Sequence, residues 1–140
     1  MKNKDRINLY KKSQQSINST RSPHDIVKFL MENLLNSMKN VLVYSDNIEK
    51  DDLKDFTKKE LAIVKSKNAS KALTIIYSLQ ISLDFDKTPE IAKNLFQIYE
   101  YCRVQIIEAL LKKTISGLSK AINALEDILD GWREIKPVGL

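Results

Sequence analysis

Hydrophobic residues recur every three or four positions over four long stretches of this chain, as they do on the buried face of an α-helix. The stretches cover about residues 22–44, 51–83, 90–113 and 114–136. Ser22 with Pro23, and Thr88 with Pro89, each place a residue that can cap a helix before a proline that suits the first turn. The pattern therefore predicts an all-α protein, an antiparallel up-and-down four-helix bundle. The polar residues 65–68 are a point at which the second helix could be interrupted.

The last stretch carries a narrow hydrophobic seam of the kind that packs in antiparallel bundles. Its members follow one another at alternating intervals of three and four residues. They are Ile115, Leu118, Ile122, Leu125, Leu129 and Trp132. We expect the residues from Leu118 to Trp132 in this seam to belong to the core.

The positive charge of the chain lies at its N-terminal end. The chain has 23 Lys and Arg residues against 18 Asp and Glu residues, which gives a net charge of +5. Residues 1–21 hold six basic residues and one acid, and 6 − 1 = +5, so the remainder sums to zero. We expect a flexible basic segment over residues 1–21, or a short helix there, ahead of a helical bundle domain over residues 22–136. A nucleic-acid adaptor would need a basic face on the bundle, and none is evident.

Few side chains of the chain suit catalysis or metal binding. The single Cys102 falls on an apolar stripe and is expected to fill the core, and the single His24 is expected to be solvent-exposed at a helix start. The sequence contains neither a Gly-rich phosphate loop nor a Glu-x-x-His pair. It also lacks a run of about 18 apolar residues, so we expect no stable membrane insertion. We expect a cytoplasmic protein that is not an enzyme and needs no cofactor or metal.

Residues 90–113 have a hydrophobic surface that is broader than a bundle core requires. Two apolar stripes adjoin, the first formed by Ile91, Leu95, Ile98, Cys102, Ile106 and Ala109, the second by Ala92, Phe96, Tyr99, Ile107 and Leu110. Together they span about 180° of the helix, against about 100° for ordinary core packing. The surplus could be covered by lysine side chains and a long second helix, by the N-terminal segment, or by a partner protein.

Several short motifs point to one protein family. They are EIAKNL at 90–95, Tyr99 with Tyr101, Arg103, EALLK at 108–112 and DGWR at 130–133, together with INLY at 7–10 and SPHD at 22–25. These motifs resemble those of the FliS family of flagellar secretion chaperones, and the resemblance spans about residues 7–135. The chain departs from the family pattern at Met31 and at Leu110, where the family has Tyr and Asn. Residues 50–65 are also about ten residues longer than usual, which extends the second helix or adds another.

The resemblance implies a cytoplasmic export chaperone. Such a protein binds the C-terminal segment of flagellin, prevents its premature polymerisation and aids its delivery to the flagellar type III export apparatus. The resemblance also suggests an export-gate component and a co-chaperone as further partners. It implies a flagellin groove, for which the candidates are Ile26, Leu30, Ile91, Leu95, Ile98, Tyr99, Arg103 and Ile107. Ile7 and Tyr10 would be a removable cover of this groove. The alternative is a helical structural or adaptor protein that acts as a homodimer.

Overall fold

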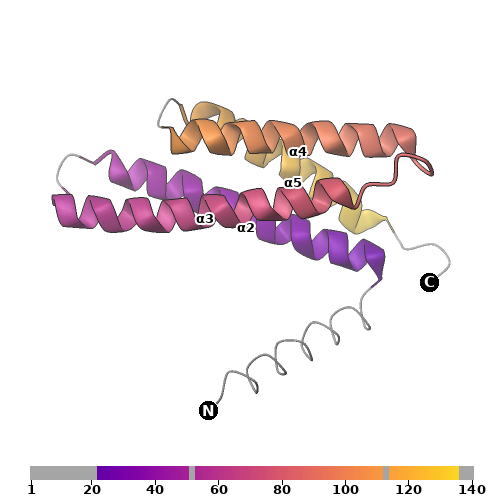
Figure 1. Ribbon diagram of the computed structural model, residues 1–140, viewed down its shortest axis with the longest axis horizontal. Helices are drawn as coiled ribbons and strands as arrows, with labels where there is room; N and C mark the ends of the chain where they lie inside the picture. The colour runs from indigo at the N-terminus through magenta and orange to yellow at the C-terminus, as the bar shows by residue number, and fades with distance from the viewer. Residues whose placement is uncertain (1–21, 51–52, 112–113, 136–140) are drawn as a thin grey trace, which may run out of the picture.

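The computed structural model describes residues 22–50, 53–111 and 114–135. Over these residues the chain forms four helices and no strand, which confirms the predicted all-α bundle (Figure 1). The helices are α2 (Pro23–Ile48), α3 (Asp55–Ile81), α4 (Pro89–Leu110) and α5 (Ser116–Glu134). The expected N-terminal segment, and any short helix within it, lies outside the described residues.

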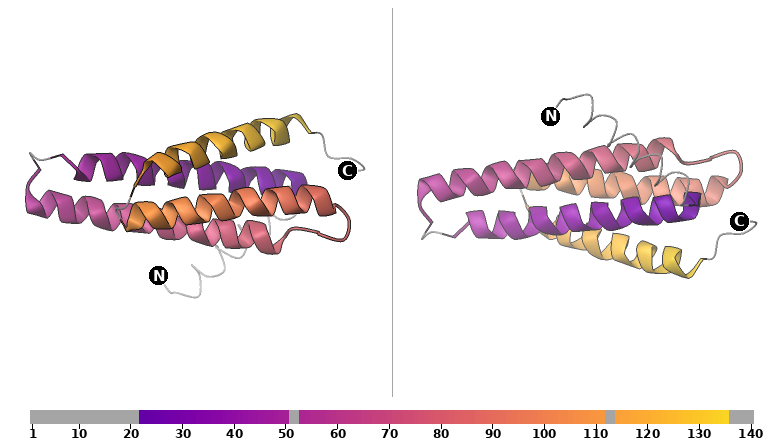
Figure 2. Two further views of the ribbon diagram at one scale, coloured as in Figure 1. Left: turned by 90° about the horizontal axis from the view of Figure 1, so that it is seen from above. Right: turned by 90° about the horizontal axis from the view of Figure 1, so that it is seen from below.

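Each helix packs against its neighbours in the chain, and α5 closes the ring by packing against α2 (Figure 2). Across the bundle, α2 also contacts α4, so these two helices lie on the shorter diagonal. Helices α3 and α5 lie on the longer diagonal. The outer face of α3 and the outer face of α5 therefore point in different directions.

The two predicted helix caps differ in the structure. The Ser22 hydroxyl accepts a hydrogen bond from the Asp25 amide at 3.1 Å, as expected for an N-cap. Thr88 is the N-cap residue of α4, as predicted, but its hydroxyl donates to the Asp84 carbonyl at 3.2 Å and forms no cap hydrogen bond with an amide of α4. The Asp84 carboxylate accepts from the Lys87 amide at 3.0 Å. The α3–α4 connection is thus held by its own turn, and this turn engages the Thr88 side chain.

Helix α3 is continuous through residues 65–68, so the expected point of interruption is not a break. Lys65, the first residue of this polar stretch, is buried. Its Nζ donates to the Ala109 carbonyl, at the end of α4, at 2.9 Å. This donor satisfies a carbonyl at the C-terminal end of α4, which has no partner within the helix itself. Within residues 50–65, the described residues from Asp55 onward belong to α3 and form no further helix, and the paired ends of α2 and α3 extend past α4 and α5 (Figure 1).

The core is one layer of side chains enclosed by the four helices. Its fully buried members are Met31, Leu34, Met38 and Val41 of α2, Ala69, Ala72, Ile76 and Leu79 of α3, Tyr99, Cys102, Ile106 and Ala109 of α4, and Leu118, Ala121, Leu125 and Leu129 of α5. The seam predicted for the last helix is confirmed from Leu118 to Leu129. Trp132 differs, since it is only partly buried and packs against the edge of this core.

Cys102 is fully buried between α4 and α5, as predicted for a core residue. Its sulfur lies 4.0 Å from the Ala121 carbonyl. Burial raises the pKa of the Cys102 thiol to about 12. The thiol therefore stays protonated at neutral pH and is a poor nucleophile.

We predict that iodoacetamide alkylates Cys102 at least about 100-fold more slowly in the folded protein than in urea, because the folded state hides the sulfur and suppresses the thiolate. Mass spectrometry of timed samples at pH 8 measures both rates. Comparable rates in the two conditions would show that the sulfur is accessible and that α4 and α5 do not enclose it.

Candidate functional site

Helix α4 divides its apolar side chains between the core and the surface. Its buried face is the seam Ala92, Leu95, Tyr99, Cys102, Ile106 and Ala109. Ile91, Phe96 and Val104 remain exposed, and the Phe96 ring makes an edge contact with the Phe85 ring at a centroid distance of 6.3 Å. The broad hydrophobic surface of this helix is thus left partly uncovered by the described residues.

An apolar groove lies where α5 diverges from α4 toward its C-terminal end (Figure 2). Its lining residues are Ile91 and Leu95 of α4, Asp127, Ile128, Gly131 and Trp132 of α5, and Ile135 just beyond the helix. We call this feature the α4–α5 groove, and its volume is about 310 Å³. Among the described residues that line it, Asp127 is the only charged one, and the others present mainly aliphatic and indole surface to a ligand.

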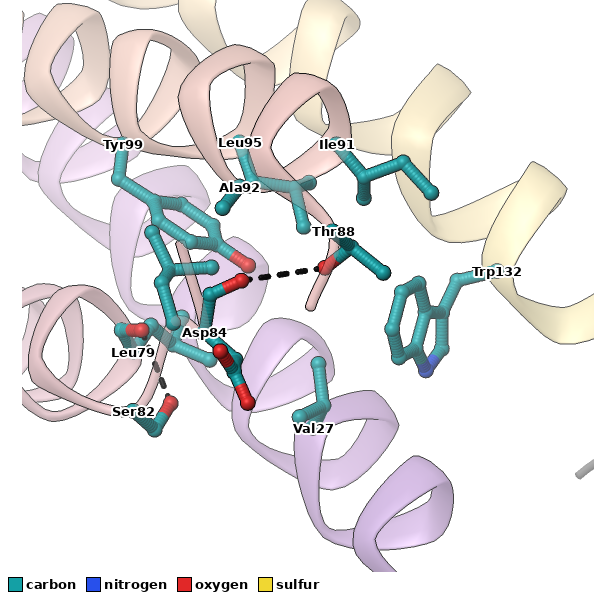
Figure 3. A pocket seen from close by; sticks show the side chains of 11 residues that line it. Val27, Leu79, Ser82, Asp84, Thr88, Ile91, Ala92, Leu95, Tyr99 and Trp132 are labelled. Atoms are coloured by element: carbon teal, nitrogen blue, oxygen red, sulfur yellow. Dashed lines mark hydrogen bonds between the residues drawn. The ribbon is translucent and has the colours of Figure 1, made fainter. Parts of the chain in front are cut away.

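A smaller pocket of about 150 Å³, the end pocket, lies beside the groove (Figure 3). It is lined by Val27, Leu79, Ser82, Leu83, Asp84, Thr88, Ala92 and Tyr99 together with three residues of the groove, Ile91, Leu95 and Trp132. Tyr99 lies at one end of the pocket and Trp132 at the other. Burial raises the pKa of the Tyr99 hydroxyl, so this group remains neutral under physiological conditions.

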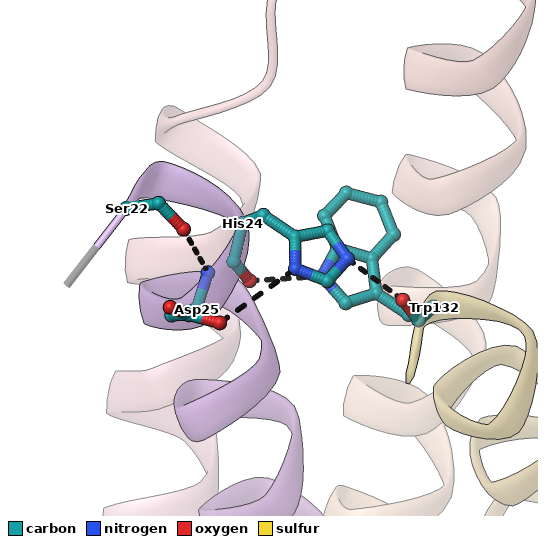
Figure 4. A network of polar contacts seen from close by, with 4 residues as sticks. All are labelled: Ser22, His24, Asp25 and Trp132. Carbon is teal, nitrogen blue, oxygen red and sulfur yellow. Dashed lines mark hydrogen bonds and ion pairs between the residues drawn. The ribbon is translucent and has the colours of Figure 1, made fainter. Parts of the chain in front are cut away.

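Trp132 is fixed by His24, which lies 108 positions away in the chain (Figure 4). The indole Nε1 donates to the His24 carbonyl at 3.0 Å, and His24 Nε2 donates to the Trp132 carbonyl at 2.7 Å. The two rings stack with centroids 5.0 Å apart and planes 7° apart. This reciprocal contact joins the first turn of α2 to the last turn of α5 and sets the position of the wall between pocket and groove.

The expected solvent exposure of His24 is therefore wrong. Its side chain is 12% exposed, because the indole of Trp132 covers one face of the ring. The helix start does lie at the end of the bundle, but the last turn of α5 reaches the same end and shields it. His24 is a structural residue of the site.

The structure brings together only some of the predicted groove residues. Ile91 and Leu95 line both the groove and the end pocket. Tyr99 lines the pocket but is 1% exposed, so most of its ring belongs to the core. Replacement of Tyr99 by Asp would bury a charge and would test folding more than binding.

The other predicted groove residues lie outside both hollows. They are Ile26 and Leu30 on α2, and Ile98, Arg103 and Ile107 further along α4. All five are half-buried. Arg103 donates to both carboxylate oxygens of Glu100 at 2.9 Å, and together with Gln80 it lowers the pKa of that carboxyl.

Sequence reasoning missed one wall of the groove. Ile128, Gly131 and Trp132 lie at i, i+3 and i+4 on one face of α5, and Ile135 follows at i+7, just beyond the end of the helix. This face adjoins the core seam, and Trp132 belongs to both patterns. This spacing could have been found in the sequence. It does not show that these residues are exposed, because their exposure depends on the divergence of α5 from α4.

The described residues contain neither a cluster of metal ligands nor a membrane-spanning helix. Nowhere among them do three or more His, Cys, Asp or Glu side chains gather as metal ligands would. In the same ranges, no helix combines the length and the hydrophobicity that a membrane span requires.

We predict that His24→Ala lowers the free energy of unfolding by about 1–2 kcal/mol, because it removes a hydrogen bond and a stacked ring. His24→Phe is the matched variant, since it keeps an aromatic ring beside Trp132 and loses only the donor, so it should lie between the parent and the Ala variant. Urea titration followed by circular dichroism measures all three. An Ala variant as stable as the parent would contradict the structural role of this contact.

Comparisons with known proteins agree with the motifs in the sequence. A family model described as "Flagellar protein FliS" matches residues 6–139. The chain is 31% identical over 134 residues to a flagellar secretion chaperone FliS of Vibrio cholerae, which covers 94% of this chain and 88% of the relative. It is 25% identical over 126 residues to the protein of that name from Salmonella typhimurium, which covers 89% and 84%. The chain therefore belongs to the FliS family of flagellar secretion chaperones, whose members are chaperones and not enzymes.

Proposed function

We propose that this chain works in the cytosol as the chaperone of flagellin, binding its C-terminal segment, preventing its premature polymerisation and aiding its delivery to the flagellar type III export apparatus. Membership of the family supports a chaperone role in flagellar export. The observation that carries the choice of client segment is the α4–α5 groove, an apolar surface at the end of the bundle that suits a short amphipathic or extended segment.

The walls of the groove have the properties of a peptide-binding surface. Ile91 and Ile135 are 55% and 54% exposed, and covering each would contribute roughly 1 kcal/mol. Trp132 is a large aromatic side chain held in place by His24, and rigid aromatic residues are frequent binding anchors. A side chain built at Gly131 would meet no atom within 4 Å, so a client residue can approach the backbone of α5 there.

We place the first contacts of the client at Ile91 and Leu95, because both line the groove. Ile98, Arg103 and Ile107 continue along α4 from this point, and Tyr99 contributes its edge at the end pocket. Ile26 and Leu30 belong to α2, on another side of the bundle, and would be reached by a client that wraps around it. Binding by apolar burial needs no nucleotide or other cofactor.

We further propose that Ile7 and Tyr10 cover this binding surface until the client displaces them. Both residues lie outside the described residues, and the proposal rests on the family resemblance. A chain that starts at residue 22 should then bind the flagellin segment more tightly than the full chain, because the competitor is gone. Calorimetric titration of both chains compares the affinities, and weaker binding by the shortened chain would assign residues 1–21 to the contact with the client.

The family resemblance suggests two further partners. An export-gate component would receive the loaded chaperone, and a co-chaperone would bind a surface that the client leaves free. A homodimer is the alternative use of exposed apolar surface. Its signature would be a mass that rises with concentration in the absence of any client.

The direct test is calorimetric titration of the full chain with the last about 40 residues of a flagellin from the same organism. We expect one-to-one binding with a negative heat-capacity change, which reports apolar burial, and only a slight loss of affinity at high salt. A salt-sensitive interaction, or none, would contradict the proposal. A concentration-dependent mass without binding of the segment would favour the homodimer.

Four variants locate the contact. Ile91→Asp should weaken binding at least about tenfold, because a carboxylate would be desolvated in the groove. The matched control is Val43→Asp on α2, where the parent side chain is 54% exposed and lines neither hollow, and it should bind as the parent does. Gly131→Leu should fill the groove and weaken binding in a folded protein, whereas Gly131→Ala should stabilise α5 by about 0.5–1 kcal/mol and spare binding. If Ile91→Asp and Val43→Asp weaken binding equally, the client does not bind in the α4–α5 groove.

A further inference from the structure

The outer face of α3 carries hydrophobic side chains that the described residues leave largely exposed. Phe56, Ile63, Tyr77 and Ile81 are 70%, 57%, 65% and 66% exposed, more than Ile91 in the α4–α5 groove. At 100° per residue all four fall within an arc of about 60°. They form a straight line along about 39 Å of the helix, which we call the α3 stripe.

The α3 stripe has the spacing of a helix-pairing seam. Glu60, Lys67, Ser70 and Thr74 fill the positions between the four apolar residues, so that members follow one another at intervals of four and three. Alternating intervals of this kind define the side of a helix that packs against another helix. The core-facing side of α3, with Ala69, Ala72, Ile76 and Leu79, points the other way. Helix α3 therefore has two apolar faces and buries only one.

The middle of the α3 stripe is positively charged. Lys67 and Lys71 are exposed there, and no Asp or Glu lies between Ile63 and Tyr77, so the exposed charge of this part is +2. Neither of these lysines forms an ion pair with a described residue. Apolar side chains thus lie toward both ends of the stripe, and unpaired cations lie at its centre.

We propose that the α3 stripe docks an amphipathic helix of a partner protein, with apolar side chains toward both ends and acidic residues at its centre. Opposite charges would pair with Lys67 and Lys71, while the ends bury Phe56 and Ile63 on one side and Tyr77 and Ile81 on the other. The complementary pattern would set the register of the partner helix as well as its affinity.

Charge argues against the occupants that the chain itself could supply. An antiparallel pair of α3 helices would bring Lys67 and Lys71 of both copies together at its centre, and a parallel pair would oppose each Lys67 to its copy. The N-terminal segment, residues 1–21, carries a charge of +5 and would be repelled in the same way. A membrane surface suits a broader apolar face than an arc of about 60° with a polar middle.

The α3 stripe is distinct from the proposed client site. Helices α3 and α5 lie on the longer diagonal of the bundle, and no residue of the stripe lines the α4–α5 groove. A helix bound to the stripe would leave the groove free. This docking therefore does not depend on the proposed function, and both sites could be filled at once.

The probe is a synthetic amphipathic helix of about 28 residues, with Leu at the positions that face the apolar side chains and Glu at those that face the lysines. The matched probe carries Lys in place of each Glu. Fluorescence anisotropy with the full chain should show at least about tenfold tighter binding of the acidic probe, and high salt should reduce the difference. Binding that is equal for both probes, or absent for the acidic probe, would overturn the proposal.

Variants and two further measurements complete the test. Ile63→Asp, and the pair Lys67→Glu with Lys71→Glu, should each weaken binding of the acidic probe at least about tenfold, whereas Lys93→Glu on α4 should not. All of these positions are exposed, and circular dichroism checks that each variant folds. Binding to phosphatidylserine vesicles that is lost in Ile63→Asp would overturn the proposal in favour of a membrane. A dimer that dissociates in Ile63→Asp would overturn it in favour of a second copy.

Discussion

A single-layer core can enclose only one stripe of each helix, and this constraint shapes the whole molecule. Four helices of 19 to 27 residues surround one layer of side chains. Each helix contributes to it a row of buried residues spaced three or four positions apart. Helices α3 and α4 carry more hydrophobic residues than one seam can hold. The surplus therefore lies at the surface, on α4 beside the groove and on the outer face of α3. We propose that these exposed apolar surfaces are where the chaperone binds its partners.

The reciprocal contact between His24 and Trp132 determines the form of the apolar end of the bundle. Because it joins the ends of two helices that start and finish the described chain, it positions the indole between the end pocket and the α4–α5 groove. The divergence of α5 from α4 then leaves Ile91, Gly131 and Ile135 uncovered. Lys65 has a similar structural role at the opposite end of α4, where it binds the Ala109 carbonyl. Polar contacts at both ends thus hold the bundle while its apolar surface stays free.

Periodicity and motifs predicted the four helices, most of the core seam and the family, because these depend on local spacing and on residue type. The burial of His24 could not be predicted, since its partner lies 108 positions away and no local pattern joins them. Residues 65–68 suggested a break for the same reason: the carbonyl that Lys65 binds belongs to another helix. The sequence also could not predict which apolar residues belong to the core and which line the groove. On α5 the two patterns share Trp132, and on α4 Leu95 lines the groove while belonging to the core.

Trp132 is the only tryptophan of the chain, and it lines the α4–α5 groove, so its fluorescence reports directly on the central claim. The measurement is its emission and its quenching by acrylamide during titration with a tryptophan-free C-terminal segment of flagellin. Occupation of the groove predicts a blue shift and weaker quenching that saturate at one segment per chain, because the client replaces water around the indole. A segment that co-elutes with the chain and leaves both signals unchanged would contradict the account, since binding would then occur away from the groove.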